Sequence, residues 1–553
     1  MRWVSFIGML VLSHLLILDG HAQSVDRARP AEWNNLVLGG RFMDRFLPMP
    51  VQGKLTRDTW GDDNVTPRYI DNGLEDNEWS YWGGNAMLGG DGRYHLFVCR
   101  WREDSKRGHH EWRRSIVVHA VADHSTGPYT VKDSIGPGHN PEAFQLSDGR
   151  LVIYVIGGYY MGDGFSGPWE KKKFEFDTRD RRIIEGLSNL SFSQREDGSY
   201  LMVCRGGGIW FSKTGITPYN QVTDARVYPP VEGRFEDPVV WRTNVQYHLI
   251  VNDWLGRIAW YLRSKDGLHW KVDPGEAYLP GIATYEDGIK VDWYKYERIK
   301  VLQDKHGRAT QTHFAVIDVL KNNDKGSDNH SSKHICIPLT VGRLLTVLNK
   351  KQITSKTKTI RVKIAAEDGF NPHTDMDLAS LRFGASEEVN YGRGCKLLKT
   401  KRSGKDLVVH FDANGHGFTG GNFAGKLLGK TSQGKLLFGY SRLPGLTYIE
   451  PALSARAPQM TRTEKGASIA VEVQNFGQVT SKASPIKILY TKDGQAINLA
   501  SGIVPALESF EKSLVELSAG TLLKAGESYD VSVIIHPEGQ MPVVLKRSIA
   551  LKK

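Results

Sequence analysis

A unit of two aromatic-rich strands joined by a tight turn recurs along residues 80–345. Its clearest copy is the segment 235–254, FEDPVVWRTNVQYHLIVNDW, in which alternating apolar residues flank a turn at Thr243-Asn244. Alternation with period two predicts two strands, and the short polar break between them predicts a hairpin. Four similar segments lie at residues 82–101, 138–158, 188–207 and 296–318. The fold must therefore accommodate one hairpin-based unit five times.

The spacing of these units, roughly 50 to 60 residues, is in the range of four-stranded propeller blades. No long helical periodicity occurs before residue 340. A β-sandwich would also contain many short strands, but it would not place a polar residue at the same point of each unit. The sequence therefore predicts an all-β protein in which residues 24–345 form a five-bladed β-propeller.

The rest of the chain predicts two further domains, because 553 residues are too many for one hydrophobic core. Residues 346–455 contain basic, strand-like stretches such as NKKQITSKTKTIRVKI and are predicted to form a small β-sandwich. Residues 456–553 alternate apolar and polar positions between polar turns, as in SPIKILYTKDGQ. This pattern predicts an immunoglobulin-like β-sandwich without catalytic residues.

The N-terminus predicts export. A basic start, MRW, precedes the apolar run 4–18 and the small-residue stretch GHA, which is the pattern of a secretory signal peptide over residues 1–23. The alternative is an N-terminal membrane anchor, although the run is short for a spanning helix. No later segment is apolar enough to span a membrane. We therefore expect a secreted or periplasmic protein.

The net charge and the cysteines indicate which ligands and partners to expect. The net charge is +11 with a pI of about 9.2, which suits an anionic polysaccharide, although lysines that merely keep the protein soluble are an equal alternative. Export and the lack of a recognition helix argue against nucleic acid. The four cysteines lack the spacing of zinc ligands, and most of them lie in apolar strand patterns, where a buried thiol acts as a small apolar group. A disulfide between two of them is the alternative.

The polar residues that open the units are candidates for a site, because the first strand of each propeller blade runs beside the central axis. Glu236 and Asp237 open the fourth unit. Hydrolysis of a glycosidic bond needs one group that protonates the leaving oxygen and another that activates water or attacks carbon, and burial or a neighbouring carboxylate raises the acid's pKa. Successive strand residues point to opposite faces, which leaves a structural role open for one of the two.

Other polar and aromatic residues near the openings are candidates for substrate binding. They are Asn85, His139, Asn140, Glu142, Asn189, Trp241, Asp253, Glu297 and Arg298. Structural alternatives remain: Asn at a strand start often caps a turn, and Glu297-Arg298 could form an ion pair between blades. For His313, on an apolar strand, the alternative is a core histidine.

Three stretches resemble the five-bladed propeller glycosidases of glycoside hydrolase families 43 and 117. They are HNPEAFQLSDGRLVIYV, FEDPVVWRTNVQYHLIVND and ERIKVLQDKHGRATQTHF, and the resemblance covers roughly residues 60–340. It implies that Glu236 is the general acid, with inversion at the anomeric carbon. It further implies that His313 either acts as an acid or holds a divalent cation (Ca or Zn) on the propeller axis; no other cofactor is expected.

The chain departs from the family 43 pattern, which has aspartates at the openings of blades one and three. We align Asn85 and Asn189 with them, and amides cannot act as a base. The base must then come from Asp71, Asp76 or Asp237, or the mechanism differs. We expect a secreted, exo-acting glycoside hydrolase on a plant or algal polysaccharide or oligosaccharide, sulfated or otherwise anionic.

Two other functions stay open. The amides at Asn85 and Asn189 favour a non-catalytic carbohydrate-binding propeller. A propeller-type glycoside phosphorylase would use Arg100, Arg257 and Arg298 to hold phosphate. The oligomeric state is not predicted.

Overall fold

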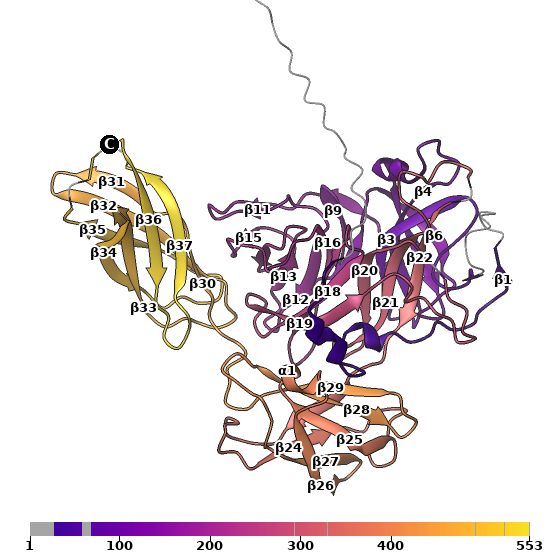
Figure 1. The fold of residues 1–553 in the computed structure, drawn as a ribbon. Coiled ribbons are helices and arrows are strands. Elements are labelled where there is room, and N and C mark those ends of the chain that lie inside the picture. The colour runs from indigo at the N-terminus through magenta and orange to yellow at the C-terminus, as the bar shows by residue number, and fades with distance from the viewer. Residues whose placement is uncertain are drawn as a thin grey trace, which may run out of the picture.

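The computed structural model describes residues 27–57, 68–291, 293–328, 330–492, 494–521, 523–524 and 526–551. The expected signal peptide, residues 1–23, lies outside them. The predicted all-β class is confirmed, since strands make up nearly all regular structure of the described part (Figure 1). The described helical elements are short: η1 (Ala31–Asn35), η2 (Met43–Arg45), η3 (Gly108–Arg114) and α1 (Ser386–Val389).

Five consecutive antiparallel sheets occupy residues 79–338 as described. Sheet one contains β3 (Trp79–Leu88), β4 (Tyr94–Arg102), β5 (Ile116–Ala122) and β6 (Thr130–Pro137). Sheet two contains β7 (Glu142–Gln145), β8 (Leu151–Val155), β9 (Gly158–Gly162) and β10 (Glu170–Lys172). Sheet three contains β12 (Ser191–Gln194), β13 (Tyr200–Val203), β14 (Ile209–Ser212) and β15 (Tyr219–Gln221), with β11 (Phe176–Asp177) parallel to β15. Sheet four contains β16 (Phe235–Arg242), β17 (Tyr247–Asp253), β18 (Ile258–Ser264) and β19 (Trp270–Tyr278), and sheet five contains β20 (Lys295–Gln303), β21 (Ala309–Ile317) and β22 (Ser332–Pro338). A separate pair is formed by β1 (Leu55–Thr56) and β2 (Arg68–Tyr69).

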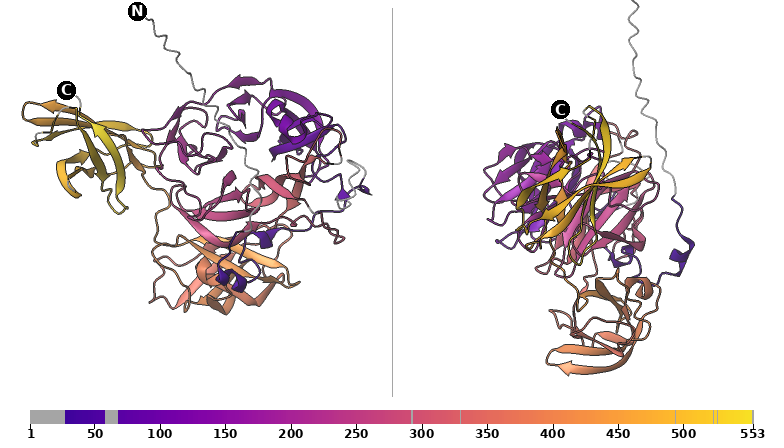
Figure 2. Two further views of the ribbon diagram at one scale, coloured as in Figure 1. Left: turned by 45° about the horizontal axis from the view of Figure 1, so that its top comes forward. Right: turned by 90° about the vertical axis from the view of Figure 1, so that its left-hand side faces the viewer.

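The first strands of these sheets meet around a common centre (Figure 2, left). Strand β3 contacts β7 and β20, and β16 contacts β12 and β20. The remaining neighbours, β7 and β12, are joined by a hydrogen bond from Ser191 Oγ to Glu142, 3.0 Å long. The sheets therefore close into a ring, with the last sheet beside the first.

Sheet five is completed by a segment that precedes sheet one. Leu74 forms an isolated antiparallel bridge with His334 on β22, and its backbone N–H donates to the His334 carbonyl at 3.0 Å. Asn72 holds the backbone of Cys336 on both sides, accepting from its N–H at 2.9 Å and donating to its carbonyl at 2.8 Å. The two ends of the 68–338 region are thus joined within one sheet.

Residues 343–442 form a closed barrel, with strands in the order β23-β24-β27-β26-β25-β28-β29. Their bounds are β23 (Arg343–Val347), β24 (Thr359–Ile364), β25 (Met376–Gly384), β26 (Cys395–Ser403), β27 (Asp406–Asp412), β28 (Ala424–Thr431) and β29 (Leu436–Arg442). The small β-sandwich predicted for residues 346–455 is therefore wrong in its architecture. The parallel pairing of β23 with β29 joins the two ends of the sheet, so no open edge remains. That pairing leaves no signal in the local alternation.

The C-terminal domain consists of two four-stranded sheets around one apolar core. The first contains β30 (Leu453–Ala455), β31 (Gln459–Thr463), β32 (Gly466–Asn475) and β35 (Lys512–Ala519). The second contains β33 (Ser484–Lys492), β34 (Gln495–Val504), β36 (Ser528–Ile535) and β37 (Val543–Ala550). Alternate residues of β32 and β33 are buried, as expected for strands with one face on a core. An immunoglobulin-like topology for residues 456–553 stays a prediction.

The N-terminal residues lie between sheet four and the barrel. Val37 donates to the Asn390 carbonyl at 3.0 Å, and Lys426 donates to the Gly39 carbonyl at 2.6 Å. The Arg45 guanidinium lies 4.5 Å from the centre of the Phe42 ring and donates to the Tyr440 hydroxyl at 3.2 Å. This segment thus bridges two domains that are far apart in the sequence.

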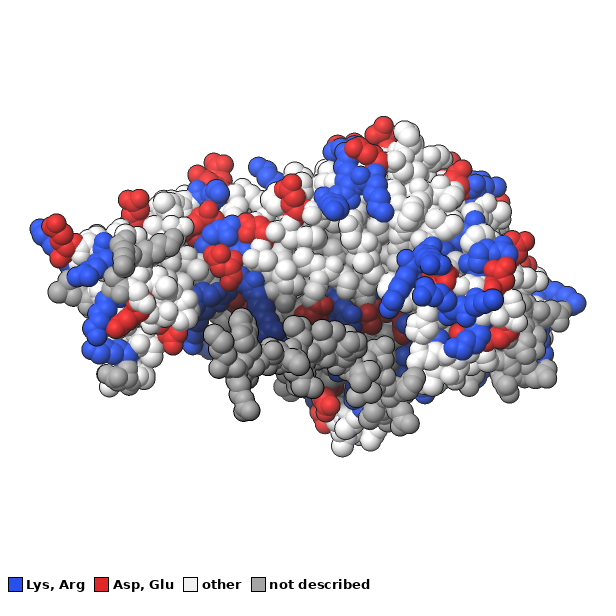
Figure 3. Space-filling model, turned by 90° about the horizontal axis from the view of Figure 1, so that it is seen from above, with Lys and Arg blue, Asp and Glu red and all other residues white. Residues whose placement is uncertain are grey.

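No helix among the described residues is long and apolar enough to cross a membrane. All four cysteines are buried and free, so they form no disulfide. On the face seen in Figure 3, basic and acidic side chains are interspersed rather than gathered in one patch. This face therefore carries no single basic patch for an anionic polymer.

Candidate active site

An unusual backbone position recurs within the first strands β3, β16 and β20 and two residues before the first strands β7 and β12. At this point Gly83, Asn140, Asn189, Asp237 and Arg298 have left-handed conformations, with φ angles of 65°, 56°, 51°, 56° and 54°. A positive φ is uncommon for any residue other than glycine. Four such residues at equivalent points of neighbouring strands indicate a site where geometry is imposed by the surrounding structure. We call these five residues the left-handed ring.

The strand registers explain why the ring exists. In β3, β16 and β20 the pairing with the next strand skips two residues directly after Trp82, Glu236 and Glu297. Each bulge turns the next residue toward the centre. The three residues before the bulge are therefore equivalent as well.

The register corrects the alignment of Asn85 with Asn189. The residue of β3 that corresponds to Asn189 is Gly83, and Asn85 lies two positions further along. Asn85 exchanges hydrogen bonds with the backbone of Ala143, donating at 2.9 Å and accepting at 2.7 Å. It therefore joins sheets one and two rather than facing the ring.

A chain of hydrogen bonds runs around the ring. Asn140 Nδ2 donates to Asn189 Oδ1 at 3.1 Å, which orients the second amide. Asn189 Nδ2 then donates to Glu236 Oε1 at 2.8 Å and to Asp237 Oδ1 at 3.1 Å. The Arg298 backbone N–H donates to Asp237 Oδ2 at 3.0 Å, and its guanidinium pairs with Asp237 Oδ1. One amide therefore contacts both adjacent carboxylates.

Glu236 and Asp237 have opposite environments. The Glu236 side chain is 22% exposed, whereas that of Asp237 is 1% exposed. Burial, followed by the negative charge of Asp237, raises the pKa of Glu236, and Arg205 at 3.6 Å opposes this rise. Burial also acts to raise the pKa of Asp237, but the charge and hydrogen bonds of Arg298 outweigh it and hold that pKa below its usual value. The pair thus contains a partly accessible acid beside a buried, ionised neighbour.

Basic and aromatic side chains border Glu236 and Glu297. Lys321 pairs with Glu297 Oε2 at 2.5 Å and lies 4.7 Å from the centre of the Trp82 ring. Lys295 lies 3.7 Å from Glu297 Oε1 and 4.7 Å from the centre of the Trp254 ring. The residues before the bulges of β16 and β20 therefore both face cations. Nothing in the sequence pattern singles out Lys295, Lys321 or Arg205.

A small polar cavity lies beside Glu297. Its volume is about 10 Å³, the space that one water molecule needs. Glu297 Oε1, Asn252 Nδ2, Trp254 Nε1 and the Tyr278 hydroxyl are buried without a hydrogen-bond partner among the described residues, and all four residues line this cavity. Buried polar atoms of this kind are costly unless a water or ligand satisfies them.

Glu142 lies one layer below the ring. It accepts from the Phe192 backbone at 2.8 Å and pairs with Lys300 of β20. Glu142 and Lys300 line a cavity of about 560 Å³ at the other end of the first strands. Glu142 thus joins sheets two, three and five, and its predicted binding role stays a prediction.

His139 precedes the ring residue Asn140. Its Nδ1 lies 3.1 Å from Ser115 Oγ, and its ring packs on Trp112 with centroids 4.7 Å apart. Burial, and then the charges of Arg298 and Lys321, hold the pKa of His139 well below its usual value. His139 therefore faces the site region as a neutral group.

His313 does not belong to the ring. It lies on β21 with no solvent exposure, its Nδ1 is 3.3 Å from Cys336 Sγ, and burial lowers its pKa to about 3. No carboxylate contributes to this shift. The prediction of His313 as a catalytic acid is therefore wrong, whereas its predicted role as a ligand of a divalent cation stays a prediction, at a place on β21 rather than in the ring.

Trp241 and Asp253 have structural surroundings. The Trp241 ring stacks on His248 with centroids 4.9 Å apart, at the opposite end of β16 from Glu236. Asp253 is fully buried and accepts hydrogen bonds from Arg27 and from the backbone N–H groups of Arg234 and Gly256. The predicted substrate-binding roles of Trp241 and Asp253 are therefore wrong. Alternating aromatic residues predict a strand, but they do not show which end of that strand lies near the ring.

The alternative bases also lie outside the ring. Asp76 accepts from the backbone N–H groups of Glu78 and Trp79 at 2.8 and 2.9 Å, which caps the start of β3. The Asp71 carboxylate lies against Gly53. Of the three candidate bases, the ring contains Asp237 alone.

No protein-family model and no curated protein matches the chain. Similar solved structures include one titled "Glycoside hydrolase", with a TM-score of 0.35 at 9% identity, covering 82% of this chain and 94% of that one. Another is a family 43 glycoside hydrolase from Bacillus licheniformis, with a TM-score of 0.32 at 10% identity, covering 88% and 90%. A sialidase has a TM-score of 0.29 at 10% identity, covering 92% and 49%. The resemblance to family 43 glycoside hydrolases is thus found again among solved structures. At these scores it carries no information on activity, which depends on the side chains of the site.

Proposed function

We propose that the protein is a glycosidase whose five sheets form a five-bladed propeller with the left-handed ring at its active centre. The single observation that supports this most is the adjacent pair Glu236 and Asp237, whose pKa values are shifted in opposite directions. Two adjacent carboxyl groups whose pKa values are shifted apart keep one group protonated beside an ionised neighbour, which is what a general acid near neutral pH requires. Glu236 is the general acid, because it is the more accessible carboxyl group and is held protonated to higher pH.

The site can also stabilise the Glu236 carboxylate that remains after proton transfer. When Glu236 gives its proton to the leaving glycosidic oxygen, it becomes an anion. Asn189 Nδ2 at 2.8 Å and Arg205 at 3.6 Å are placed to stabilise that anion. Asp237 stays ionised beside Arg298 and tunes its neighbour without taking part in proton transfer.

We assign the second carboxylate to Glu297. It occupies in β20 the place that Glu236 occupies in the neighbouring strand β16, and its charge raises the pKa of Glu236. Its Oε1 faces the water-sized cavity. An inverting reaction needs a carboxylate that activates water on the side opposite the acid, and Glu297 is the acidic residue that fits this role.

The basic residues Arg205, Lys295 and Lys321 support an anionic sugar as substrate, in line with a sulfated or uronic-acid-containing chain. Exo-action, a plant or algal origin of the substrate, and export through the segment 1–23 are parts of this proposal.

The second candidate is a non-catalytic carbohydrate-binding protein. The observation in its favour is that the Glu297 carboxylate is paired with Lys321 and lies near Lys295, so both of its oxygens already face ammonium groups. A phosphorylase is less well supported. Arg298 is already paired with Asp237, and Arg100 lies 3.9 Å from the centre of the Trp79 ring.

A panel of sulfated, uronic-acid-containing and neutral oligosaccharides, with products identified by mass spectrometry, tests the proposal. We expect release of small sugars by the unaltered protein and a loss of roughly 10²–10⁴-fold in Glu236→Gln. Glu297→Gln should be equally slow, and azide, which attacks the anomeric carbon from the face that water uses, should restore turnover and give a glycosyl azide of the same inverted configuration. Glu196→Gln, at the other end of the sheets, is the matched control. Binding by calorimetry without any product would support the carbohydrate-binding alternative instead.

A further inference from the structure

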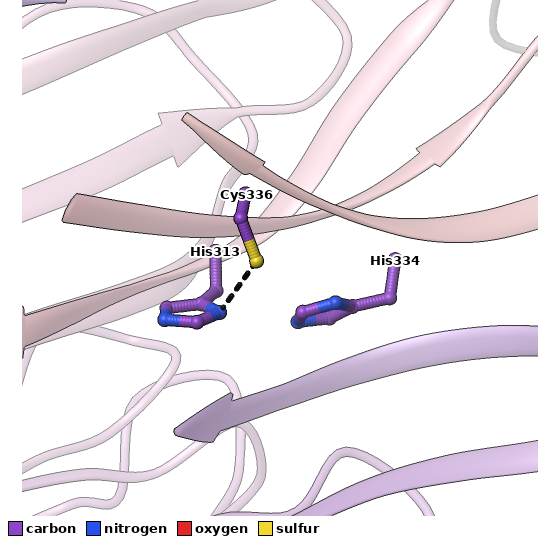
Figure 4. Close-up of side chains that lie close together, drawn as sticks. All are labelled: His313, His334 and Cys336. Atoms are coloured by element: carbon purple, nitrogen blue, oxygen red, sulfur yellow. Dashed lines mark hydrogen bonds between the residues drawn. The ribbon is translucent and has the colours of Figure 1, made fainter. Parts of the chain in front are cut away.

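A histidine–histidine–cysteine cluster lies inside the closure between sheet five and sheet one (Figure 4). His313 comes from β21, and His334 and Cys336 come from β22. One ligand-type atom from each residue lies within 4.8 Å of the others, and all three residues are buried. Among the described residues, this is the group in which three such atoms come together.

The sheet places these side chains on one face. His313 and Cys336 are directly opposite each other in the β21–β22 ladder, and His334 and Cys336 are two residues apart on one strand. Residues with these relationships point to the same side of a sheet. Cys336 packs there in one core cluster with Leu74 and Tyr81.

The backbone that carries the cluster is held from both sides. Leu74 bridges His334, and Asn72 holds both backbone groups of Cys336. The three side chains are therefore fixed by a paired strand rather than by a loop. Such a support is what a preorganised metal site needs.

The imidazole of His334 gives the second, independent observation. It has no solvent exposure, and neither of its ring nitrogens has a hydrogen-bond partner among the described residues. Buried polar groups are almost always paired. In Figure 4 the ring lies beside His313 and Cys336, so the missing partner belongs in the space between the three.

The distances suit a thiophilic metal ion. Zinc binds nitrogen at about 2.0 Å and sulfur at about 2.3 Å, so two tetrahedral ligands, one of each, lie roughly 3.5 Å apart. His313 Nδ1 and Cys336 Sγ are 3.3 Å apart. His313 Nε2 faces the Gln311 amide at 3.4 Å, so its Nδ1 is the nitrogen directed at the cluster.

We propose that His313, His334 and Cys336 form a structural site for a thiophilic transition-metal ion, with Zn²⁺ as the expected occupant. Both imidazoles are held neutral by burial, which is the form that binds a metal. On binding, the Cys336 thiol loses its proton to solvent and the thiolate bonds to the metal. The ion joins β21 and β22 in the sheet that the N-terminal Leu74 segment completes. No carboxylate contributes to the pKa shifts of His313 and His334, and we assign the ion no part in the proposed hydrolysis.

The site is inaccessible in the folded protein, so the metal must enter during folding. The test unfolds the full chain, refolds it with Zn²⁺ or with a chelator, and measures metal per chain after dialysis. We expect one Zn²⁺ per chain for the unaltered protein and for the control Cys204→Ser, which removes another buried thiol. Cys336→Ser and His334→Ala should hold none, while circular dichroism shows that they remain folded.

If the Cys336→Ser and His334→Ala variants do not fold, refolding the unaltered protein with Co²⁺ still tests the proposal. The unaltered protein should then show a thiolate-to-cobalt charge-transfer band, which the Glu236→Gln variant retains. A folded, unaltered protein without this band, or with equal metal content in the Cys336→Ser variant, overturns the proposal. If the unaltered protein shows the cobalt band but hydrolyses none of the oligosaccharides, the proposed function is contradicted and the metal site is supported.

Discussion

Asp237 and Arg298 occupy the same position in neighbouring first strands and form an ion pair that is almost completely shielded from solvent, with side-chain exposures of 1% and 3%. Both residues have a left-handed backbone, so the pair is held by two bulges at once. Breaking a buried pair by removing one partner leaves an uncompensated charge.

Arg298→Met should therefore destabilise the ring by roughly 3–5 kcal/mol. Asp237→Asn should have a comparable effect, and the double variant should cost less than the sum of the two because the residues are coupled. Thermal unfolding followed by circular dichroism measures this. Arg263→Met, which breaks the buried pair with Asp273, should lower stability but leave turnover unchanged. Equal, additive losses for Asp237 and Arg298 would contradict the coupling.

The pH dependence of stability should differ in sign for the two carboxylates. The pKa of Asp237 is held below its usual value, so its contribution is present above the unfolded pKa of about 4 and is lost as the pH falls through the folded value. The pKa of Glu236 is raised, so its contribution is present at low pH and is lost as the pH rises. The free energy of unfolding of Glu236→Gln, measured from acid to neutral pH, should lack the contribution that falls as the pH rises. It should keep the contribution of Asp237, which falls as the pH decreases.

The alkaline limit of activity should report the Glu236 proton. Arg205 lowers the pKa of Glu236 against the effect of burial, so Arg205→Gln should move the alkaline limb of kcat/KM to higher pH. Arg242→Gln is the matched control, because Arg242 pairs with Glu196 at the opposite end of β16. A shift in the control, or a shift of the Arg205→Gln limb to lower pH, would contradict the assignment.

Lys321 should select for charge on the sugar. Its ammonium lies between Glu297 and the Trp82 ring, so Lys321→Met should raise KM for sulfated or uronic-acid oligosaccharides more than for neutral ones. Initial rates on paired substrates measure this ratio. Lys172→Met, whose pairing with Glu170 lies on an outer strand, should leave the ratio unchanged. An equal effect on both substrate classes would mean that Lys321 only positions Glu297.

Arg179 should decide how firmly the C-terminal domain is held. Its side chain is fully buried and donates to Glu472, Gln474 and the Ser454 carbonyl at 3.0, 3.0 and 2.9 Å. Arg179→Ala removes all three contacts, so the segment 443–452 should be cut faster in limited proteolysis, with the activity retained. Arg182→Ala, which removes an exposed side chain three residues further along the same loop, is the control. Unchanged cleavage would show that other contacts hold the domain.

The alternation of apolar and polar residues predicts where the strands lie, but it does not predict how they pair with one another. The all-β class and the repeated hairpins follow from alternation, which a strand imposes on every second residue. The equivalence of Gly83 with Asn189 does not follow, because two bulged residues shift the alignment and leave no mark in the pattern. The same limitation applies to the barrel, where one parallel pairing between β23 and β29 closes the sheet.

The carboxylate pair was recognisable because two acids interrupt an apolar strand. Its partners were harder to identify, since Arg205, Lys295 and Lys321 come from different loops and strands and meet only in the folded chain. His313 was misplaced for the opposite reason: a histidine next to apolar residues has the same local sequence in a core and in a site. His334 and Cys336 lie on the next strand, and only the pairing of β21 with β22 brings them beside it.

The segment around Arg45 also constrains the order of assembly. Arg45 precedes its partner Tyr440, which lies in the last strand of the barrel, by 395 residues. Phe42 packs on Tyr261 of sheet four, with ring centroids 5.0 Å apart, whereas the contact of Arg45 with Tyr440 can form only after the last strand of the barrel has been made. A truncation before Phe438 should therefore leave the buried Arg45 guanidinium without its barrel partners Phe438 and Tyr440, and should lower the stability of the junction between sheet four and the N-terminal segment.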